Sequence, residues 1–121
     1  MSAPPPAQMI RLRRIRLLRA QRNWRQLLDA RGQLRQALSA LTREYEAQQA
    51  AGRQCLRHAE AGAARYTLVM RRACAHQTQA ASLGRQAQAL AKQLDEMTPQ
   101  LRSARVALEK ARRLLEESSP R

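Results

Sequence analysis

The sequence predicts an all-α protein, a long antiparallel two-helix coiled-coil hairpin. Good helix formers dominate its 121 residues, aromatic residues make up only 2 %, and the β-branched residues that favour sheets are few. Apolar residues also recur every seven positions along two separate stretches, as they do in coiled coils. Between these stretches lies a glycine-containing segment, residues 52–64. Two helices joined by a short connection pack antiparallel, so a hairpin follows.

The first stretch predicts a helix over about residues 9–57, after a disordered, proline-rich tail at residues 1–8. Counting in sevens from Ile10 gives the a positions of a heptad, and counting from Arg13 gives the d positions. The pattern is strongest between Leu17 and Tyr45 and decays after them. We expect this helix to pack through a seam made of Leu17, Trp24, Leu27, Leu34, Leu38, Leu41 and Tyr45.

The second stretch predicts a helix over about residues 65–117, after a turn at about 58–64, so that residues 9–118 form one hairpin. Its a positions run in sevens from Tyr66 and its d positions from Val69. Alanines occupy the a positions nearest the turn, and larger side chains follow. The expected seam residues of this helix are Leu83, Leu90, Leu94, Met97, Leu101 and Leu108.

Two registers of the hairpin fit this pattern, and the sequence leaves both open. In one register the numbers of facing residues add to 121, which places Leu38 opposite Leu83. In the other, one heptad along, they add to 128, which places Leu38 opposite Leu90. Polar residues also occupy seam positions in either register. These polar residues are Arg13, Arg31, Gln48 and His76. Each side chain either extends outward to water or is reserved for contact with a partner.

Pro99 interrupts the second stretch and allows two interpretations. A proline within a helix removes one hydrogen bond and kinks the backbone. The heptad phase nevertheless continues through Pro99, which occupies an outer f position, so we favour a continuous, kinked helix. The other interpretation is a break, with Thr98 as the N-cap of a third helix and Pro99 at its first position.

Charge is the main functional signal in the sequence. The chain has 23 basic and 9 acidic residues, which give a net charge of +14. Such an excess attracts acidic proteins, nucleic acid or acidic membranes. In a hairpin, arginines from both ends of the chain come together in a base cluster: Arg11, Arg13, Arg14, Arg16, Arg19, Arg22, Arg25, Arg112 and Arg113. A second group, the tip cluster, surrounds the turn: Arg53, Arg57, Arg65, Arg71 and Arg72. We expect both clusters to bind partners.

The sequence contains no pattern typical of catalysis, and we predict a protein that is not an enzyme. The glycines are isolated, no serine or cysteine has a plausible histidine base, and the acids are scattered over outer helical faces. Cys55 and Cys74 lack metal or redox spacing. We therefore expect no cofactor, metal or small-molecule substrate. With neither a signal sequence nor a membrane-spanning stretch, a cytoplasmic location is expected.

The basic run from Met9 to Arg19, MIRLRRIRLLR, followed by a helical hairpin, resembles the FliJ/YscO class of type III secretion stalk proteins. The resemblance covers nearly the whole chain and concerns length, charge and heptad organisation. It implies a cytosolic central stalk, peripheral to the inner-membrane secretion apparatus. Such a stalk would insert its open helical end into the hexameric secretion ATPase and reach toward the cytosolic domain of the export gate. The class has also been linked to escorting export chaperones.

Two other functions are compatible with the composition. An arginine-rich helical protein can bind nucleic acid by neutralising phosphates, although base-stacking aromatic residues and recognised motifs are missing. An adaptor could instead dimerise through leftover apolar residues such as Leu18, Leu28 and Leu114.

Overall fold

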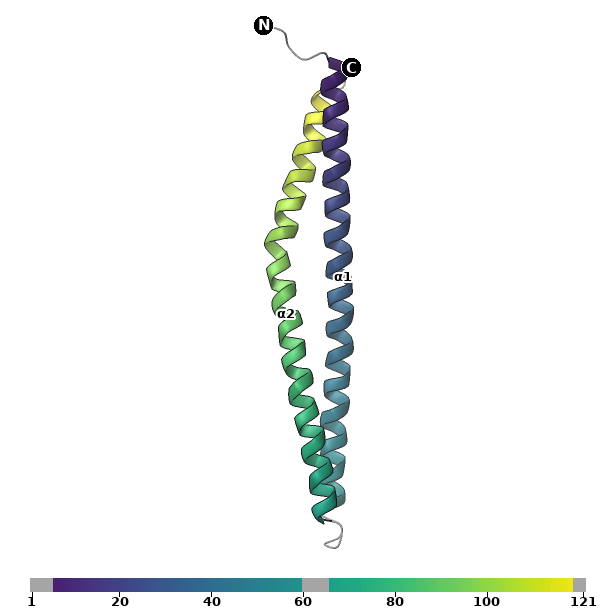
Figure 1. The fold of residues 1–121 in the computed structure, drawn as a ribbon, viewed down its shortest axis with the longest axis vertical. Coiled ribbons are helices and arrows are strands. Elements are labelled where there is room, and N and C mark those ends of the chain that lie inside the picture. The colour runs from purple at the N-terminus through teal and green to yellow at the C-terminus, as the bar shows by residue number, and fades with distance from the viewer. Residues whose placement is uncertain (1–5, 60–65, 119–121) are drawn as a thin grey trace. The chain divides into compact units, whose positions relative to one another are not determined.

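A computed structural model describes residues 6–59 and 66–118 and shows two long helices, α1 and α2 (Figure 1). Helix α1 spans Pro6–Ala59, 54 residues, and α2 spans Tyr66–Glu117, 52 residues. The described residues contain no strand. The two helices pack against each other, which confirms the predicted all-α helical hairpin.

Helix α1 begins earlier than the sequence predicted. The expected tail covered residues 1–8, but Pro6, Ala7 and Gln8 belong to the first turn of α1. Proline suits this position because the first residues of a helix donate no intrahelical hydrogen bond and proline has no N–H to donate. Helix α1 also extends two residues past the expected end at 57, and α2 begins one residue after the expected start. Residues 1–5 and 60–65, which include most of the predicted tail and turn, lie outside the described residues.

The chain divides into two compact units, and each combines a segment of α1 with a segment of α2. Unit 1 contains the described residues 6–33 and 95–118, and unit 2 is Leu34–Leu94. Within unit 1 the start of α1 (purple) lies beside the end of α2 (yellow), and within unit 2 the later part of α1 lies beside the start of α2 (Figure 1). The pairing is antiparallel in each unit.

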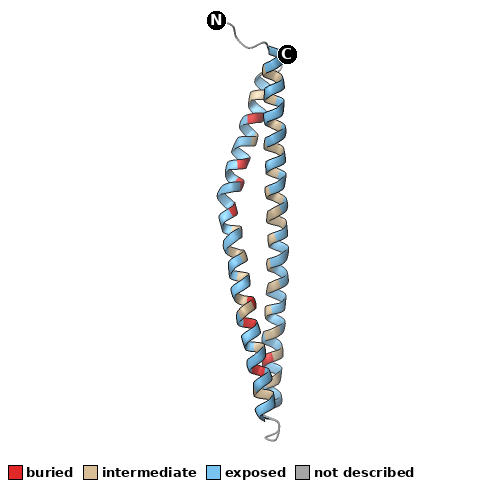
Figure 2. Cartoon of the chain, viewed as in Figure 1, coloured by how far each residue is buried: buried red, intermediate tan, exposed pale blue. Residues whose placement is uncertain are grey.

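The core of each unit is the narrow seam that the heptad pattern predicts. Buried residues are few (Figure 2), and all of them occupy a or d positions. The remaining a and d residues are half-buried, apart from Tyr66, which is 53 % exposed. The buried residues are Gly52, Ala73, Ala80, Leu83, Met97, Leu101, Ala104 and Ala111.

Contacts across the seam distinguish the two registers. In unit 2, a Cβ atom built on Gly52 would lie 3.5 Å from the Cβ of His76, and one built on Gly84 would lie 3.5 Å from the ring of Tyr45. The residue numbers of the first pair add to 128, and those of the second pair add to one more than 128. In the register whose numbers add to 121, Gly52 would instead lie opposite Val69. The structure therefore has the register that pairs Leu38 with Leu90, not the one that pairs Leu38 with Leu83.

Helix α2 continues through Pro99 without interruption. The proline is exposed at its outer f position, so its ring does not enter the seam. Met97 and Leu101, on either side of it, are each only 8 % exposed and anchor the helix against α1. Burial of such side chains offsets the hydrogen bond that proline removes. The interpretation with a third helix starting at Pro99 is therefore wrong.

We predict that Leu83→Ala lowers the free energy of unfolding by about 2–4 kcal/mol, because a buried leucine leaves a cavity when it is truncated. Leu83 is 8 % exposed and Leu68, on the same helix, is 51 % exposed. Leu68→Ala is the matched control and should change stability by no more than about 0.5 kcal/mol. Urea unfolding followed by circular dichroism measures both values. Equal losses for the two variants would contradict the seam.

The register predicts a disulfide between cysteines placed at Gly52 and His76, in a background where Cys55 and Cys74 are serine. Disulfides need Cβ atoms about 3.5–4.5 Å apart, and this pair meets that condition. Mild oxidation followed by mass spectrometry under non-reducing conditions should show an intramolecular bond. The control pair, Gly52→Cys with Val69→Cys, should stay reduced, and the opposite result would favour the rejected register.

Candidate functional site

The structure brings the base cluster together in unit 1, from segments far apart in the sequence. On α1 the run from Arg11 to Arg25 covers about four helical turns and contains no acid. On α2, Arg112 and Arg113 lie in the facing segment, together with Arg102, Arg105 and Lys110. The exposed members of the predicted cluster are Arg11, Arg14, Arg16, Arg19, Arg22, Arg25, Arg112 and Arg113. They form a broad cationic surface on both helices of the unit.

Arg13 has a structural role that the sequence did not reveal. It is half-buried at its d position, and its Nη1 donates hydrogen bonds to the carbonyl oxygen of Leu114, at 2.6 Å, and to the hydroxyl of Ser118. The Ser118 hydroxyl donates in turn to the same carbonyl, at 2.9 Å. The last carbonyl groups of a helix lack intrahelical partners and carry partial negative charge, so a guanidinium stabilises them. Arg13 therefore caps α2 across the seam.

Negative charge does little to neutralise the arginines. Among residues 6–59 and 66–118, one ion pair forms, between Nε of Arg105 and Oε1 of Glu109 at 3.5 Å. Its side chains are 72 % and 51 % exposed, and exposed pairs of this kind contribute little stability. The positive charge of the base cluster consequently remains available to an acidic partner.

The tip cluster lies in unit 2. Arg53 and Arg57 come from the end of α1, and Arg71 and Arg72 come from the start of α2. All four are exposed. The fifth predicted member, Arg65, lies outside the described residues. The Nε of Arg53 donates to the carbonyl oxygen of Gln49 at 3.4 Å, which holds its side chain along α1.

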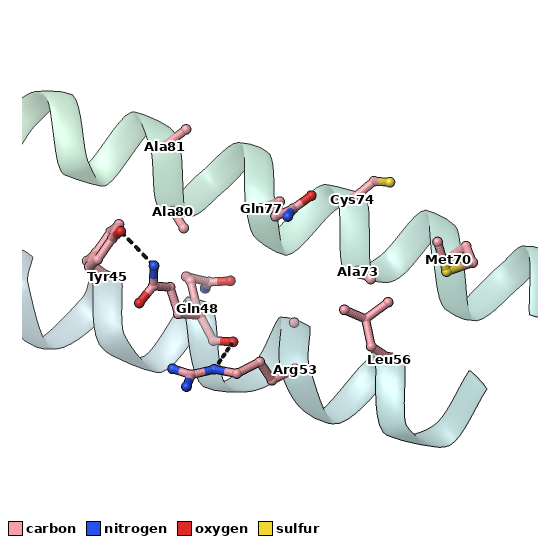
Figure 3. A pocket seen from close by; sticks show the side chains of 12 residues that line it. Tyr45, Gln48, Arg53, Leu56, Met70, Ala73, Cys74, Gln77, Ala80 and Ala81 are labelled. Atoms are coloured by element: carbon pink, nitrogen blue, oxygen red, sulfur yellow. Dashed lines mark hydrogen bonds between the residues drawn. The ribbon is translucent and has the colours of Figure 1, made fainter. Parts of the chain in front are cut away.

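A groove of about 710 Å³ opens between the helices of unit 2 (Figure 3). Its depth follows from small seam residues, since Gly52, Ala73 and Ala80 fill little of the space between the helices. Tyr45 and Leu56 extend from α1 toward α2, as Figure 3 shows. The groove is mostly apolar, with amide side chains along its edge. Sequence reasoning missed it, although the run of small residues at a positions was its signal.

Two of the polar seam residues pair with each other in unit 2. The Nδ1 atom of His76 and the Oε1 atom of Gln48 are 2.6 Å apart, and both side chains are half-buried. Beside them, the amide of Gln49 donates to the Tyr45 hydroxyl at 2.6 Å. Buried polar groups need hydrogen-bond partners, and this pair supplies them across the seam. Gln48 and His76 thus contribute to the hairpin itself, a third possibility beyond the two that the sequence suggested.

The described ranges contain no cluster of metal-ligating side chains. No group of three or more His, Cys, Asp or Glu side chains there could hold a metal ion. Cys55 is half-buried and Cys74 is exposed, and both are free thiols. Neither α1 nor α2 contains a segment apolar enough to cross a bilayer. The described surface carries two cationic clusters and a groove.

Comparison with protein families, with curated proteins and with solved structures found no match to this chain. The fold and the surfaces described above are consequently the basis for any functional conclusion. They define a basic helical hairpin in which, among the described residues, Arg105 is the one exposed arginine that forms an ion pair with an acid.

We predict that Arg13→Ala lowers the free energy of unfolding by about 1–2 kcal/mol, since charge-assisted hydrogen bonds to the Leu114 carbonyl of α2 and to Ser118, which follows α2, are lost. The adjacent Arg14 is exposed and forms no hydrogen bond with another described residue. Arg14→Ala removes the same charge and should change stability by less than about 0.5 kcal/mol. Urea unfolding distinguishes the two. A similar effect of both substitutions would show that net charge, rather than the cap, is responsible.

Proposed function

We propose that this protein is the central stalk of a type III secretion ATPase complex, coupling the hexameric ATPase to the export gate. The observation that supports this proposal most strongly is the base cluster, in which exposed arginines from the start of α1 and the end of α2 lie in one unit. The helical hairpin and the basic run at the start of α1 are the features that resemble the FliJ/YscO class. The proposed location is the cytoplasm, peripheral to the inner-membrane secretion apparatus.

The proposed mechanism uses many weak contacts instead of one specific lock. Guanidinium groups bind carboxylates through paired hydrogen bonds and remain charged at any physiological pH. A ring lumen lined by carboxylates would hold the base cluster at several positions of similar energy, which suits a stalk that must change position relative to its ring. The tip cluster of Arg53, Arg57, Arg71 and Arg72 is the proposed contact for the cytosolic domain of the export gate.

The chain itself performs no reaction in this proposal. It binds no cofactor and no small-molecule substrate, and the ATPase supplies all the chemistry. Escort of export chaperones is a further role of the class that the proposal includes. An amphipathic helix can lay its apolar face in a hydrophobic groove, so the groove of unit 2 is the proposed contact for a chaperone.

Charge reversal of the base cluster tests the proposal. We predict that Arg14→Glu, Arg16→Glu and Arg19→Glu together abolish stimulation of the secretion ATPase from the same organism, because repulsion replaces attraction to its carboxylates. Arg13 is left unchanged because it caps α2. The measurement is the rate of phosphate release by the purified ATPase with and without the protein.

The matched control is Arg43→Glu, Arg85→Glu and Lys92→Glu, which changes the net charge equally at exposed positions of unit 2. This variant should stimulate the ATPase as the unchanged protein does, and circular dichroism should show both variants to be helical. Full stimulation by the base variant, or equal loss in both, would remove the base cluster from the proposed contact.

Nucleic-acid binding is the alternative function, and the near absence of ion pairs among the described arginines is the observation that favours it. Its signature is a binding constant that falls with salt by about one power per phosphate contact. Retention of the protein on immobilised RNA and on the ATPase, compared at physiological salt, separates the two functions.

A further inference from the structure

Three aliphatic side chains lie on the outer face of α1 in unit 1 and remain exposed among the described residues. Leu12 is 55 % exposed, Ile15 is 40 % exposed and Leu18 is 62 % exposed. Residues three apart are neighbours on a helix, so the three side chains form one slanting row. The seam residues of the same turns, Arg13 and Leu17, are half-buried toward α2. Folding of the hairpin therefore leaves this row uncovered.

Arginines border the row on both sides. Residues four apart in a helix are also neighbours, which places Arg11 and Arg19 beside Ile15, and Arg14 and Arg22 beside Leu18. All four arginines are exposed. The first acid of α1 is Asp29, and Glu109 on α2 is paired with Arg105. The acids in the last turn of α2, Glu116 and Glu117, are exposed and form no ion pair with a described residue.

The combination of aliphatic and cationic side chains indicates which class of partner suits this face: a second copy of the chain, a nucleic acid or a membrane. A second copy of this chain would bring the same arginines against this face, and like charges repel. A nucleic acid would offer phosphates to the arginines but no apolar phase for the leucines and isoleucine. An anionic bilayer offers both, since its headgroups attract guanidinium groups while its acyl region receives the aliphatic side chains.

We propose that the outer face of α1 from Arg11 to Arg22, with the Leu12, Ile15 and Leu18 row at its centre, binds the surface of anionic membranes. The helix lies in the plane of the interface and does not cross it, in keeping with the lack of a spanning segment in α1 and α2. The long arginine side chains keep their charged ends among the headgroups while their stems lie beside the aliphatic row. The seam is unaffected, so the hairpin binds without unfolding.

This inference goes beyond the stalk function and does not rest on it. The stalk proposal concerns an acidic protein surface, for which the arginines suffice. Membrane binding requires the aliphatic row as well, so neutral substitutions in that row separate the two interactions.

The test uses the full chain and sedimentation with vesicles of phosphatidylcholine, either pure or containing phosphatidylglycerol. We expect binding to the anionic vesicles and none to the neutral ones. Leu12→Gln, Ile15→Gln and Leu18→Gln together preserve every charge and should weaken binding roughly tenfold or more, because the apolar contribution to partitioning is lost. The matched control, Leu56→Gln, Leu68→Gln and Val106→Gln, alters three other exposed aliphatic residues and should bind as the unchanged protein does.

A second measurement places the contact on α1. An environment-sensitive dye on Leu18→Cys, with Cys55 and Cys74 replaced by serine, should shift its emission to the blue with anionic vesicles, whereas the same dye on Leu68→Cys should not. Several results would overturn the proposal. They are binding to neither kind of vesicle, equal binding to both kinds, and unchanged binding of the variant with three glutamines in the row. A fourth is that these substitutions change only the self-association of the protein, measured by sedimentation without vesicles.

Discussion

The fold depends on one constraint: two helices with almost no aromatic residues must find their stability in a seam only a few side chains wide. Every buried residue lies at an a or d position of the heptad, and several of them are alanine or glycine. Such residues bury little area, and the two described helices have this one seam between them. Pro99 is tolerated for the same reason, since only the face toward α1 has to be preserved.

The narrow seam also determines how many charged side chains are exposed on the surface. Since most residues of the hairpin are exposed, most of its arginines are exposed too, and the described residues give them only one acidic partner. Mutual repulsion of these charges opposes folding, and the seam must outweigh it. Arg13 is an instructive case, because its charge is placed where partial negative charge accumulates, at the end of α2, and there it stabilises the fold.

The heptad repeat was sufficient to predict the helices and the seam, because seven-residue spacing of apolar side chains specifies which face packs. It could not select the register, since Leu38 meets a leucine in either one. The contacts of Gly52 with His76 and of Gly84 with Tyr45 separate the two registers. The sequence could name the exposed arginines that share each unit, although it could not show that Arg13 is half-buried, and Arg65 lies outside the described residues. The capping by Arg13 and the pairing of Gln48 with His76 could not be predicted, because both depend on which residues face each other across the seam.

The small residues around the groove have a consequence for motion. In unit 1 the seam holds Met97 and Leu101, whereas much of the buried seam of unit 2 consists of Gly52, Ala73 and Ala80. The free energy of local opening follows the apolar area that an opening exposes. Transient separation of the helices is therefore easier around Ala73 and Ala80 than around Leu101. We therefore expect backbone amides around Ala73 and Ala80 to meet solvent more often than those around Leu101.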